Sequence, residues 1–200
     1  MEEMRAAGKL ALWERLAEQD SLPAWDAIPN FGVYMDQVVT LLEQYLSFLP
    51  EDGERIVSSS AINNYVRLKI MPAPVKRKYY RVHLAYLLMI LPMKQSISIA
   101  DIPRILPVDT DEEGIRAAYE DYAAQFRKTA RFFNTQVADV LGDMSDDGGG
   151  LCRLALESVL ISSFARILAD QLIPLQEKDK GKDKDKEKDK GKERTEPSAT

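Results

Sequence analysis

A chain of 200 residues with 45% hydrophobic and 30% charged side chains is long enough for one globular domain and a helical extension. One Cys and one His exclude an internal disulfide and a Cys/His zinc cluster, and no apolar run reaches the roughly 18 residues that span a bilayer. The N-terminus, with Glu2 and Glu3 before Met4, lacks the layout of a signal peptide, so we expect a cytoplasmic protein without membrane, metal or cofactor partners. The net charge of −5, taken for the whole chain, disfavours a general nucleic-acid binder.

Two amphipathic helices are predicted before the middle of the chain. Residues 4–18 place Leu10, Trp13 and Leu16 on one side, and a Pro-containing loop follows. Residues 34–48 repeat apolar side chains at i, i+3, i+4 and i+7, which predicts a second helix that ends before Gly53.

The middle of the chain predicts two more helices around a short basic segment. The hydroxyls of Ser58–Ser60 can cap a helix over 61–69, and Pro72 and Pro74 end it. Residues 76–81 are basic and aromatic, which suits a loop or a small β-wing. Residues 82–95 predict an apolar helix that carries Leu84–Leu91 and is kinked or broken at Pro92.

The C-terminal half predicts a helical hairpin and a tail. Ser98 and Asp101 resemble a capping box for a short helix to Ile105, and Asp111 can cap a long helix to about residue 141. A more apolar helix follows over 151–173. Neither long helix can bury its apolar face alone, so they must pack on the N-terminal half, on a partner subunit, or on both. We expect a homodimer through 111–173.

The predicted fold is mainly α. It has a winged helix-turn-helix-like N-terminal half, an antiparallel helical hairpin and a disordered charged tail. The expected divisions are an N-terminal helix (1–21), the winged-helix-like domain (22–107), the hairpin as a dimerisation or effector region (108–174), and the Lys/Asp/Glu-rich tail (175–200).

Charge is unevenly distributed along this acidic chain. Residues 55–100 hold eight Lys or Arg and no Asp or Glu, whereas the segments before and after them are acidic. Burial of the segment would explain the missing acids, but not the added bases. We therefore favour an exposed basic patch, which attracts anionic partners more strongly than the net charge of the whole chain suggests.

A hydroxyl-capped helix that displays Asn, Arg and Lys is chemically suited to a DNA major groove. Asn pairs with adenine and Arg with guanine, while Lys and Arg of the following loop meet phosphates. The expected groove contacts are Ser60, Asn63, Asn64 and Arg67, and the expected phosphate contacts are Lys69, Lys76, Arg77, Lys78 and Arg81. An alternative is that Asn63 and Asn64 are buried amides that tie down backbone groups.

Several sequence blocks resemble a known bacterial family, domain of unknown function 1836. The most specific are Ile62-Asn63-Asn64-Tyr65-Val66 and the Tyr80-x-x-His83-Leu84-Ala85 region, and the resemblance spans about Leu22 to Leu106. It implies membership of that family and no particular biochemical activity.

The pattern over 59–106 is also similar to MerR-type winged-helix DNA-binding domains. Tyr65, Pro72 and Tyr80-Arg81 stand where that pattern has a capped helix, its end and a wing, and a Leu-rich helix follows. This similarity implies a transcription-regulator fold, often dimeric through C-terminal helices, with double-stranded DNA as its partner. A protein-interaction module of the same shape that binds no DNA is the alternative.

Other candidate sites favour structural roles. His83 has no second His or acid nearby in sequence to support catalysis, so it is interpreted as a capping or surface residue. Cys152 is interpreted as a small core residue, and the Gly148–Gly150 run lacks the flanking residues of a phosphate-binding loop. No set of nucleophile, base and acid is present, so we expect no enzyme.

Overall fold

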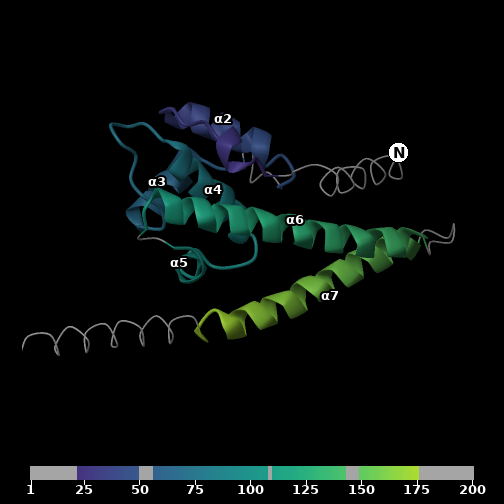
Figure 1. The fold of residues 1–200 in the computed structure, drawn as a ribbon. Helices are drawn as coiled ribbons and strands as arrows, with labels where there is room; N and C mark the ends of the chain where they lie inside the picture. Colours follow the sequence, from purple (N-terminus) through teal and green to yellow (C-terminus); the bar gives the residue numbers. More distant parts are fainter. Residues whose placement is uncertain (1–21, 50–55, 108–109, 143–148, 176–200) are drawn as a thin grey trace, which may run out of the picture.

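The computed structural model describes residues 22–49, 56–107, 110–142 and 149–175, and within them it confirms a mainly helical fold. The predicted helix over 4–18 and the charged tail lie outside these residues. The described elements are the short 3₁₀ turn η1 (Trp25–Ala27) and the helices α2 (Met35–Tyr45), α3 (Ser59–Arg67), α4 (Arg81–Met93), α5 (Ile102–Ile105), α6 (Glu112–Gly142) and α7 (Gly149–Leu172). Figure 1 shows their arrangement.

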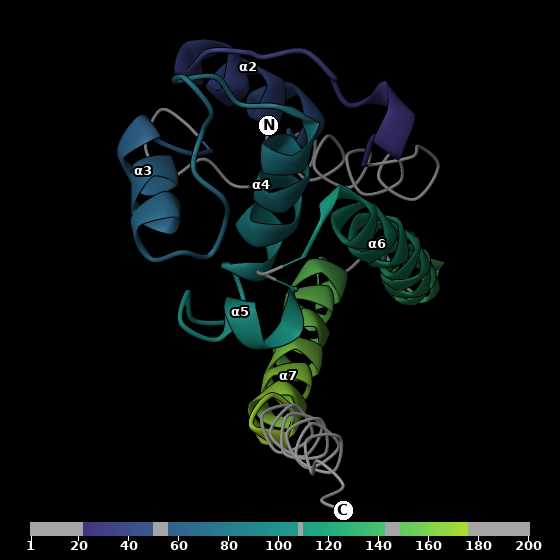
Figure 2. The same ribbon diagram turned by 60° about the vertical axis from the view of Figure 1, so that its left-hand side comes forward.

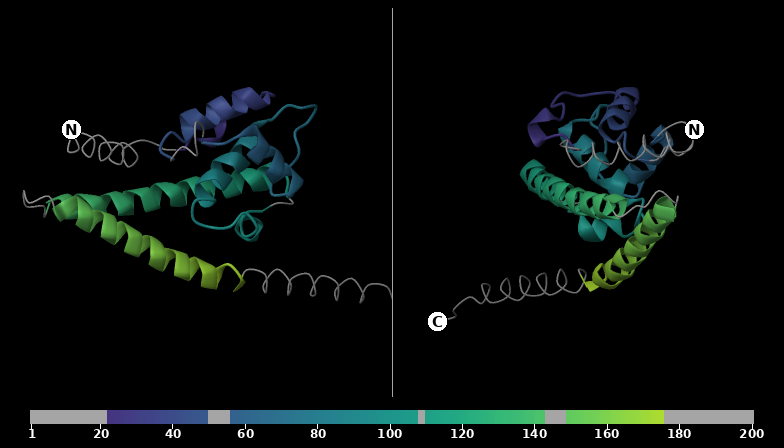
Figure 3. Two further views of the ribbon diagram at one scale, coloured as in Figure 1. Left: turned by 180° about the vertical axis from the view of Figure 1, so that it is seen from behind. Right: turned by 90° about the vertical axis from the view of Figure 1, so that its right-hand side faces the viewer.

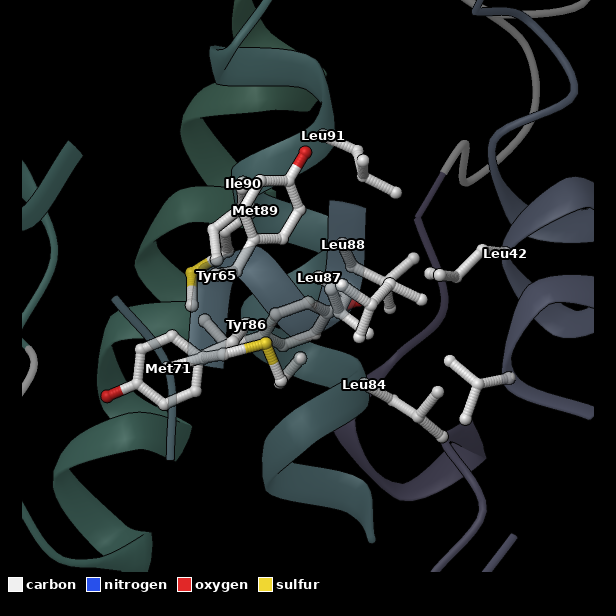
Figure 4. Packing of buried hydrophobic residues seen from close by; sticks show 14 of the residues in the cluster. Leu42, Tyr65, Met71, Leu84, Tyr86, Leu87, Leu88, Met89, Ile90 and Leu91 are labelled. Carbon is white, nitrogen blue, oxygen red and sulfur yellow. The ribbon is translucent and has the colours of Figure 1, made fainter. Parts of the chain in front are cut away.

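Helix α4 is the centre of the core. Every residue from His83 to Leu91 is buried, so this helix is covered on all its faces rather than along one stripe. Helices α2, α3 and α6 lie on different sides of it (Figure 2). In Figure 4, Leu88 points toward Leu42 of α2, whereas Tyr65 and Met71 lie on the opposite side of α4. The predicted apolar helix with Leu84–Leu91 is confirmed, and Tyr65 of α3 belongs to the same core.

A short antiparallel bridge joins the starts of α2 and α4. The Val33 amide donates to the Tyr79 carbonyl at 2.9 Å, and the Tyr79 amide donates back to the Val33 carbonyl at 2.8 Å. Both side chains are buried. Because each residue immediately precedes the N-cap of its helix, this pair fixes the two helix N-termini side by side.

The first half of α6 belongs to the same core. Its residues Ile115, Tyr119 and Ala123 are buried against α4 and η1. The Tyr119 hydroxyl donates to the Pro23 carbonyl at 2.7 Å, and its ring packs 6.0 Å from that of Trp25. This helix therefore holds the N-terminal loop onto the body of the protein.

Helix α7 runs back from the end of α6 and diverges from it, as Figures 1 and 3 show. Its surface is largely apolar and exposed, with Phe164 71% accessible. Cys152 is also exposed, so its prediction as a core residue is wrong, because it lies on a side of α7 that no described element covers. The other exposed apolar residues of α7 are Leu156, Val159, Leu160, Ile161, Ile167, Leu168 and Leu172.

The predicted side-chain caps are confirmed for α3 and α6 but not for α5. Of the three serines predicted to cap α3, Ser58 does so, and the helix begins at Ser59 rather than at residue 61. Asp111 caps α6 as predicted, since its carboxylate accepts from the Gly114 amide at 2.9 Å. The expected capping box of α5 is wrong: the Ser98 hydroxyl donates to the Asp101 carboxylate at 2.6 Å, and no side chain caps the helix backbone.

We expect Tyr119→Phe to lower the free energy of unfolding by about 1 kcal/mol, because the Pro23 carbonyl loses its hydrogen-bond donor. Urea denaturation monitored by circular dichroism measures the change. Tyr122→Phe is the matched control, because the neighbouring Tyr122 is covered by apolar groups without a hydrogen bond to any described residue. Equal losses in the two variants would contradict the structural role of Tyr119.

Candidate nucleic-acid interface

One face of α3 packs into the core and the other carries polar side chains. Ile62 and Tyr65 are buried, and the Ser58 hydroxyl accepts from the Ala61 amide at 3.2 Å to cap the helix. On the outer face Asn63 is exposed, so the alternative of a buried Asn63 amide is wrong. Asn64 is half-buried, and its side-chain oxygen accepts from the Arg67 guanidinium at 2.7 Å.

This polar face forms an open depression of about 590 Å³. The structure therefore brings together all four residues that the sequence predicts as groove contacts. The lining residues are Ser58, Ser60, Ala61, Asn63, Asn64 and Arg67. They supply hydroxyls, amides and one guanidinium, which are the groups that hydrogen-bond to base edges and phosphates.

Helix α3 ends on a basic residue in a left-handed conformation. Lys69 has φ 56°, its amide donates to the Val66 carbonyl at 3.0 Å, and the Ile70 amide donates to the Tyr65 carbonyl at 3.0 Å. This pair of bonds is the Schellman ending, in which the left-handed position is usually Gly. The Lys69 side chain is exposed beyond the helix end.

The predicted small β-wing is a two-residue turn. Val75 and Lys78 exchange backbone hydrogen bonds of 3.0 and 2.9 Å, and Lys76 and Arg77 form the tip with φ 51° and 64°. Positive φ at both central residues is the signature of a type I′ turn, which strongly favours Asn-Gly. Here the two positions hold exposed cations instead. We call residues 75–78 the basic turn.

His83 braces the segment that carries the basic turn. The Tyr80 amide donates to its Nδ1 at 3.0 Å, so Nε2 carries the proton and donates to the Ala73 carbonyl, also at 3.0 Å. The side chain is only 3% exposed, so the interpretation as a surface residue is wrong and the interpretation as a cap is right. Burial lowers the pKa of His83 below 6.5, which keeps the ring neutral.

Arg81 is tied to the N-terminal loop rather than to the surface. Its guanidinium donates to the Ile28 carbonyl at 3.0 Å, pairs with Asp26 at 3.4 Å and lies over the Trp25 ring. With only 15% of its side chain exposed, it holds η1 against α4. We therefore leave Arg81 out of the phosphate contacts that the sequence predicts.

Three of the predicted phosphate contacts face solvent, whereas the Lys78 side chain is half-buried. Lys69, Lys76 and Arg77 are exposed and form no ion pair with any residue that the structure describes. The loop that carries the basic turn lies at the same end of the molecule as α3, away from the turn between α6 and α7 (Figure 3). The α3 face and the basic turn thus form a positively charged end, where anionic groups are attracted.

Sequence reasoning named His83 as a possible cap but missed its second hydrogen bond, to the Ala73 carbonyl. The capping bond has a local signal in the sequence. Tyr34-x-x-Gln37 and Tyr80-x-x-His83 share the three-residue spacing of a capping box. In both, the residue three positions on accepts from the N-cap amide, at 2.9 Å for Gln37 and 3.0 Å for His83. That spacing predicts a helix start with a side-chain acceptor.

In the described ranges, no helix is both long and apolar enough to cross a membrane, and no three His, Cys, Asp or Glu side chains gather where a metal could bind. The described fold and site define a small helical protein with a polar helix face and a basic turn at one end. The chain belongs to the family described as Domain of unknown function (DUF1836), whose profile matches residues 23–122. This confirms the family resemblance and extends it into α6.

No curated protein and no solved structure matches the chain. The similarity to MerR-type domains therefore stays a prediction from the sequence.

We expect the free energy of unfolding to fall as the pH drops below about 6.5, because the unfolded chain takes up a proton on His83 before the folded one does. Urea denaturation between pH 7.5 and 5.5 measures this loss. His83→Gln should be less stable at pH 7.5, since Ala73 loses its donor, yet it should lack the decline over this range. A wild-type stability that stays level from pH 7.5 to 5.5 would contradict the assignment.

Proposed function

We propose that this protein binds double-stranded DNA through the polar face of α3 and the basic turn, and that it acts as a transcriptional regulator of winged helix-turn-helix type. In this proposal Ser60, Asn63 and Arg67 contact base edges, and Lys69, Lys76 and Arg77 contact phosphates. Of the other predicted contacts, Asn64 is left out because its side-chain oxygen already accepts from Arg67, and Lys78 because its ammonium lies beside the Tyr34 ring. The order α2, α3, turn, α4 is compatible with that architecture, with the basic turn in the place of the wing.

The main observation behind the proposal is that basic residues occupy the strained backbone positions. All non-glycine residues with positive φ in the described chain are basic: Lys69, Lys76 and Arg77. A left-handed conformation costs a side chain with a Cβ roughly 1–2 kcal/mol, which Gly avoids. Exposed cations occupy all three of these positions, although the chain as a whole is acidic. This placement favours a function for the positive charge itself.

A protein partner with an acidic surface is the second candidate. Binding of an acidic protein would use the same exposed cations. It would require no contact from Asn63, which lines the depression of α3. The exposed Asn63 lines the same depression as Arg67 and favours DNA, because amide and guanidinium donors match base edges in the major groove.

We expect the double variant Lys76→Asn, Arg77→Gly to weaken DNA binding about tenfold or more at low salt, while the fold becomes equally or more stable. Asn-Gly suits the turn better than Lys-Arg, so lost binding cannot be attributed to unfolding. The slope of log affinity against log salt should become shallower by about 2, one for each lost phosphate contact. Fluorescence anisotropy on mixed genomic fragments measures both quantities.

The matched control removes the same charge from α6, with Lys128→Gln and Arg131→Gln at two exposed positions. It should leave the salt slope near that of the unchanged protein. The proposal fails if both double variants weaken binding equally, or if the turn variant keeps its full slope. Capture of an acidic protein by the unchanged chain alone, with no DNA binding, would favour the second candidate.

We also propose that α7 pairs with α7 of a second copy. A helix whose apolar residues face solvent over most of its circumference is stable only when another surface covers it. The charges of its described part balance within two pairs, Arg153 with Glu157 and Arg166 with Asp170. A second α7 therefore meets no net repulsion. The Arg166 guanidinium also donates to the Ser96 carbonyl, which ties α7 to the loop after α4.

We expect the unchanged protein to sediment as a dimer and Phe164→Glu to weaken that dimer by about a hundredfold, because each dimer loses two buried aromatic rings. Analytical ultracentrifugation over a concentration series measures the change. Gln125→Glu adds the same charge at an exposed position of α6 and should remain dimeric. A monomeric wild type would refute the pairing.

A further inference from the structure

A second surface adjoins the tip of the basic turn and shares Lys78 with it, and its two tyrosines are not among the proposed duplex contacts. Its members are Gly32, Tyr34, Lys78 and Tyr80. Tyr34 is 53% exposed, although it is large and aromatic. The Lys78 ammonium lies 5.5 Å from the centre of the Tyr34 ring, within the range of a cation–π contact. We call these four residues the aromatic–cation surface.

The bridge between Val33 and Tyr79 explains why these residues meet. In an antiparallel pair, the neighbours of two bridged residues are themselves opposite each other, and successive side chains point to opposite faces. Val33 and Tyr79 point into the core. Residues 34 and 78, and residues 32 and 80, are therefore opposite one another on the outward side.

Gly32 makes room for the side chains that cross over it. A Cβ at this position would lie 2.7 Å from Cδ of Lys78 and 3.1 Å from Cζ of Tyr80. The absence of a side chain lets the Lys78 stem and the Tyr80 ring approach the backbone closely. The Lys78 ammonium lies beside the Tyr34 ring in the free protein, so the two groups are already together before any ligand arrives.

We propose that Tyr34 stacks on an unpaired nucleobase while the three cations of the basic turn, Lys76, Arg77 and Lys78, hold the adjacent phosphates. The surface would then take single-stranded DNA or a locally opened duplex. This inference rests on the proposed nucleic-acid binding and adds to it the kind of DNA that is recognised.

The chemistry of the surface favours unpaired bases over other anionic partners. An aromatic ring binds any base through its face, and in an intact duplex those faces are covered by neighbouring base pairs. A purely electrostatic contact with phosphates would not need an exposed tyrosine. An acidic peptide would be served by the cations alone, whereas here the ring and the ammonium are held together as one unit.

The test compares three fluorescent DNA probes of one length and related sequence: a single strand, a fully paired duplex and a duplex with a central mismatched bubble. We expect the single strand or the bubble to bind more tightly than the duplex at equal salt, and a base analogue such as 2-aminopurine to lose fluorescence on binding. Tighter binding of the bubble than of the single strand would indicate an opened duplex as the ligand, and the reverse would indicate a single strand.

Tyr34→Leu should weaken binding to the preferred probe about fivefold to a hundredfold, the range for loss of one stacked base. Its affinity for the intact duplex and its salt slope should stay unchanged, because no phosphate contact is removed. Tyr34→Phe should bind like the wild type. Gln37 caps the Tyr34 backbone amide in each variant, so the start of α2 is retained. Phe132→Leu, an exposed aromatic on α6, is the matched control.

Two results would overturn the inference. One is equal affinity for all three probes, and the other is a Tyr34→Leu variant that binds the preferred probe as tightly as Phe132→Leu does. If the basic-turn variant still loses duplex affinity in those cases, the proposed duplex binding stands without the stacking contact. If no probe binds, or if neither surface matters to binding, both proposals fail together.

Discussion

The two backbone hydrogen bonds between Val33 and Tyr79 determine how this end of the protein is built. They join segments that are distant in sequence, and they do so immediately before α2 and α4 begin. Because both side chains are buried, the residues on either side of the bridge must face outward. The exposed tyrosine, the lysine beside it and the basic turn therefore owe their positions to one short bridge rather than to a complete sheet.

The site and the core share a second constraint in His83. Its ring is buried among the apolar residues of α4, yet its two nitrogens hold the backbone of the loop on both sides of the basic turn. Burial also lowers its pKa, so the neutral form that can accept one bond and donate the other is the stable one. The stability of the fold and the position of the exposed cations consequently depend on the same imidazole.

The sequence predicts the described helices well, because burial against one core leaves a periodic pattern that short windows reveal. It also predicts that Ser60, Asn63, Asn64 and Arg67 share a surface, since these residues lie within one helix. The pairing of Val33 with Tyr79 leaves no local pattern, so the position of Tyr34 beside Lys78 and the engagement of Arg81 by Asp26 could not be predicted. The exposure of Cys152 depends on the divergence of α7 from α6, which helical periodicity does not encode.

The basic turn shows how the stability of the body permits strain at the surface. Lys76 and Arg77 occupy backbone conformations that cost each of them roughly 1–2 kcal/mol, and neither gains an ion pair with a described residue in return. Burial of one leucine contributes a similar amount, and α4 buries leucines along most of its length. A core of this kind can offset a strained tip without unfolding. In the proposed complex with DNA, the strained turn contributes two cations that are already held in place when a phosphate arrives.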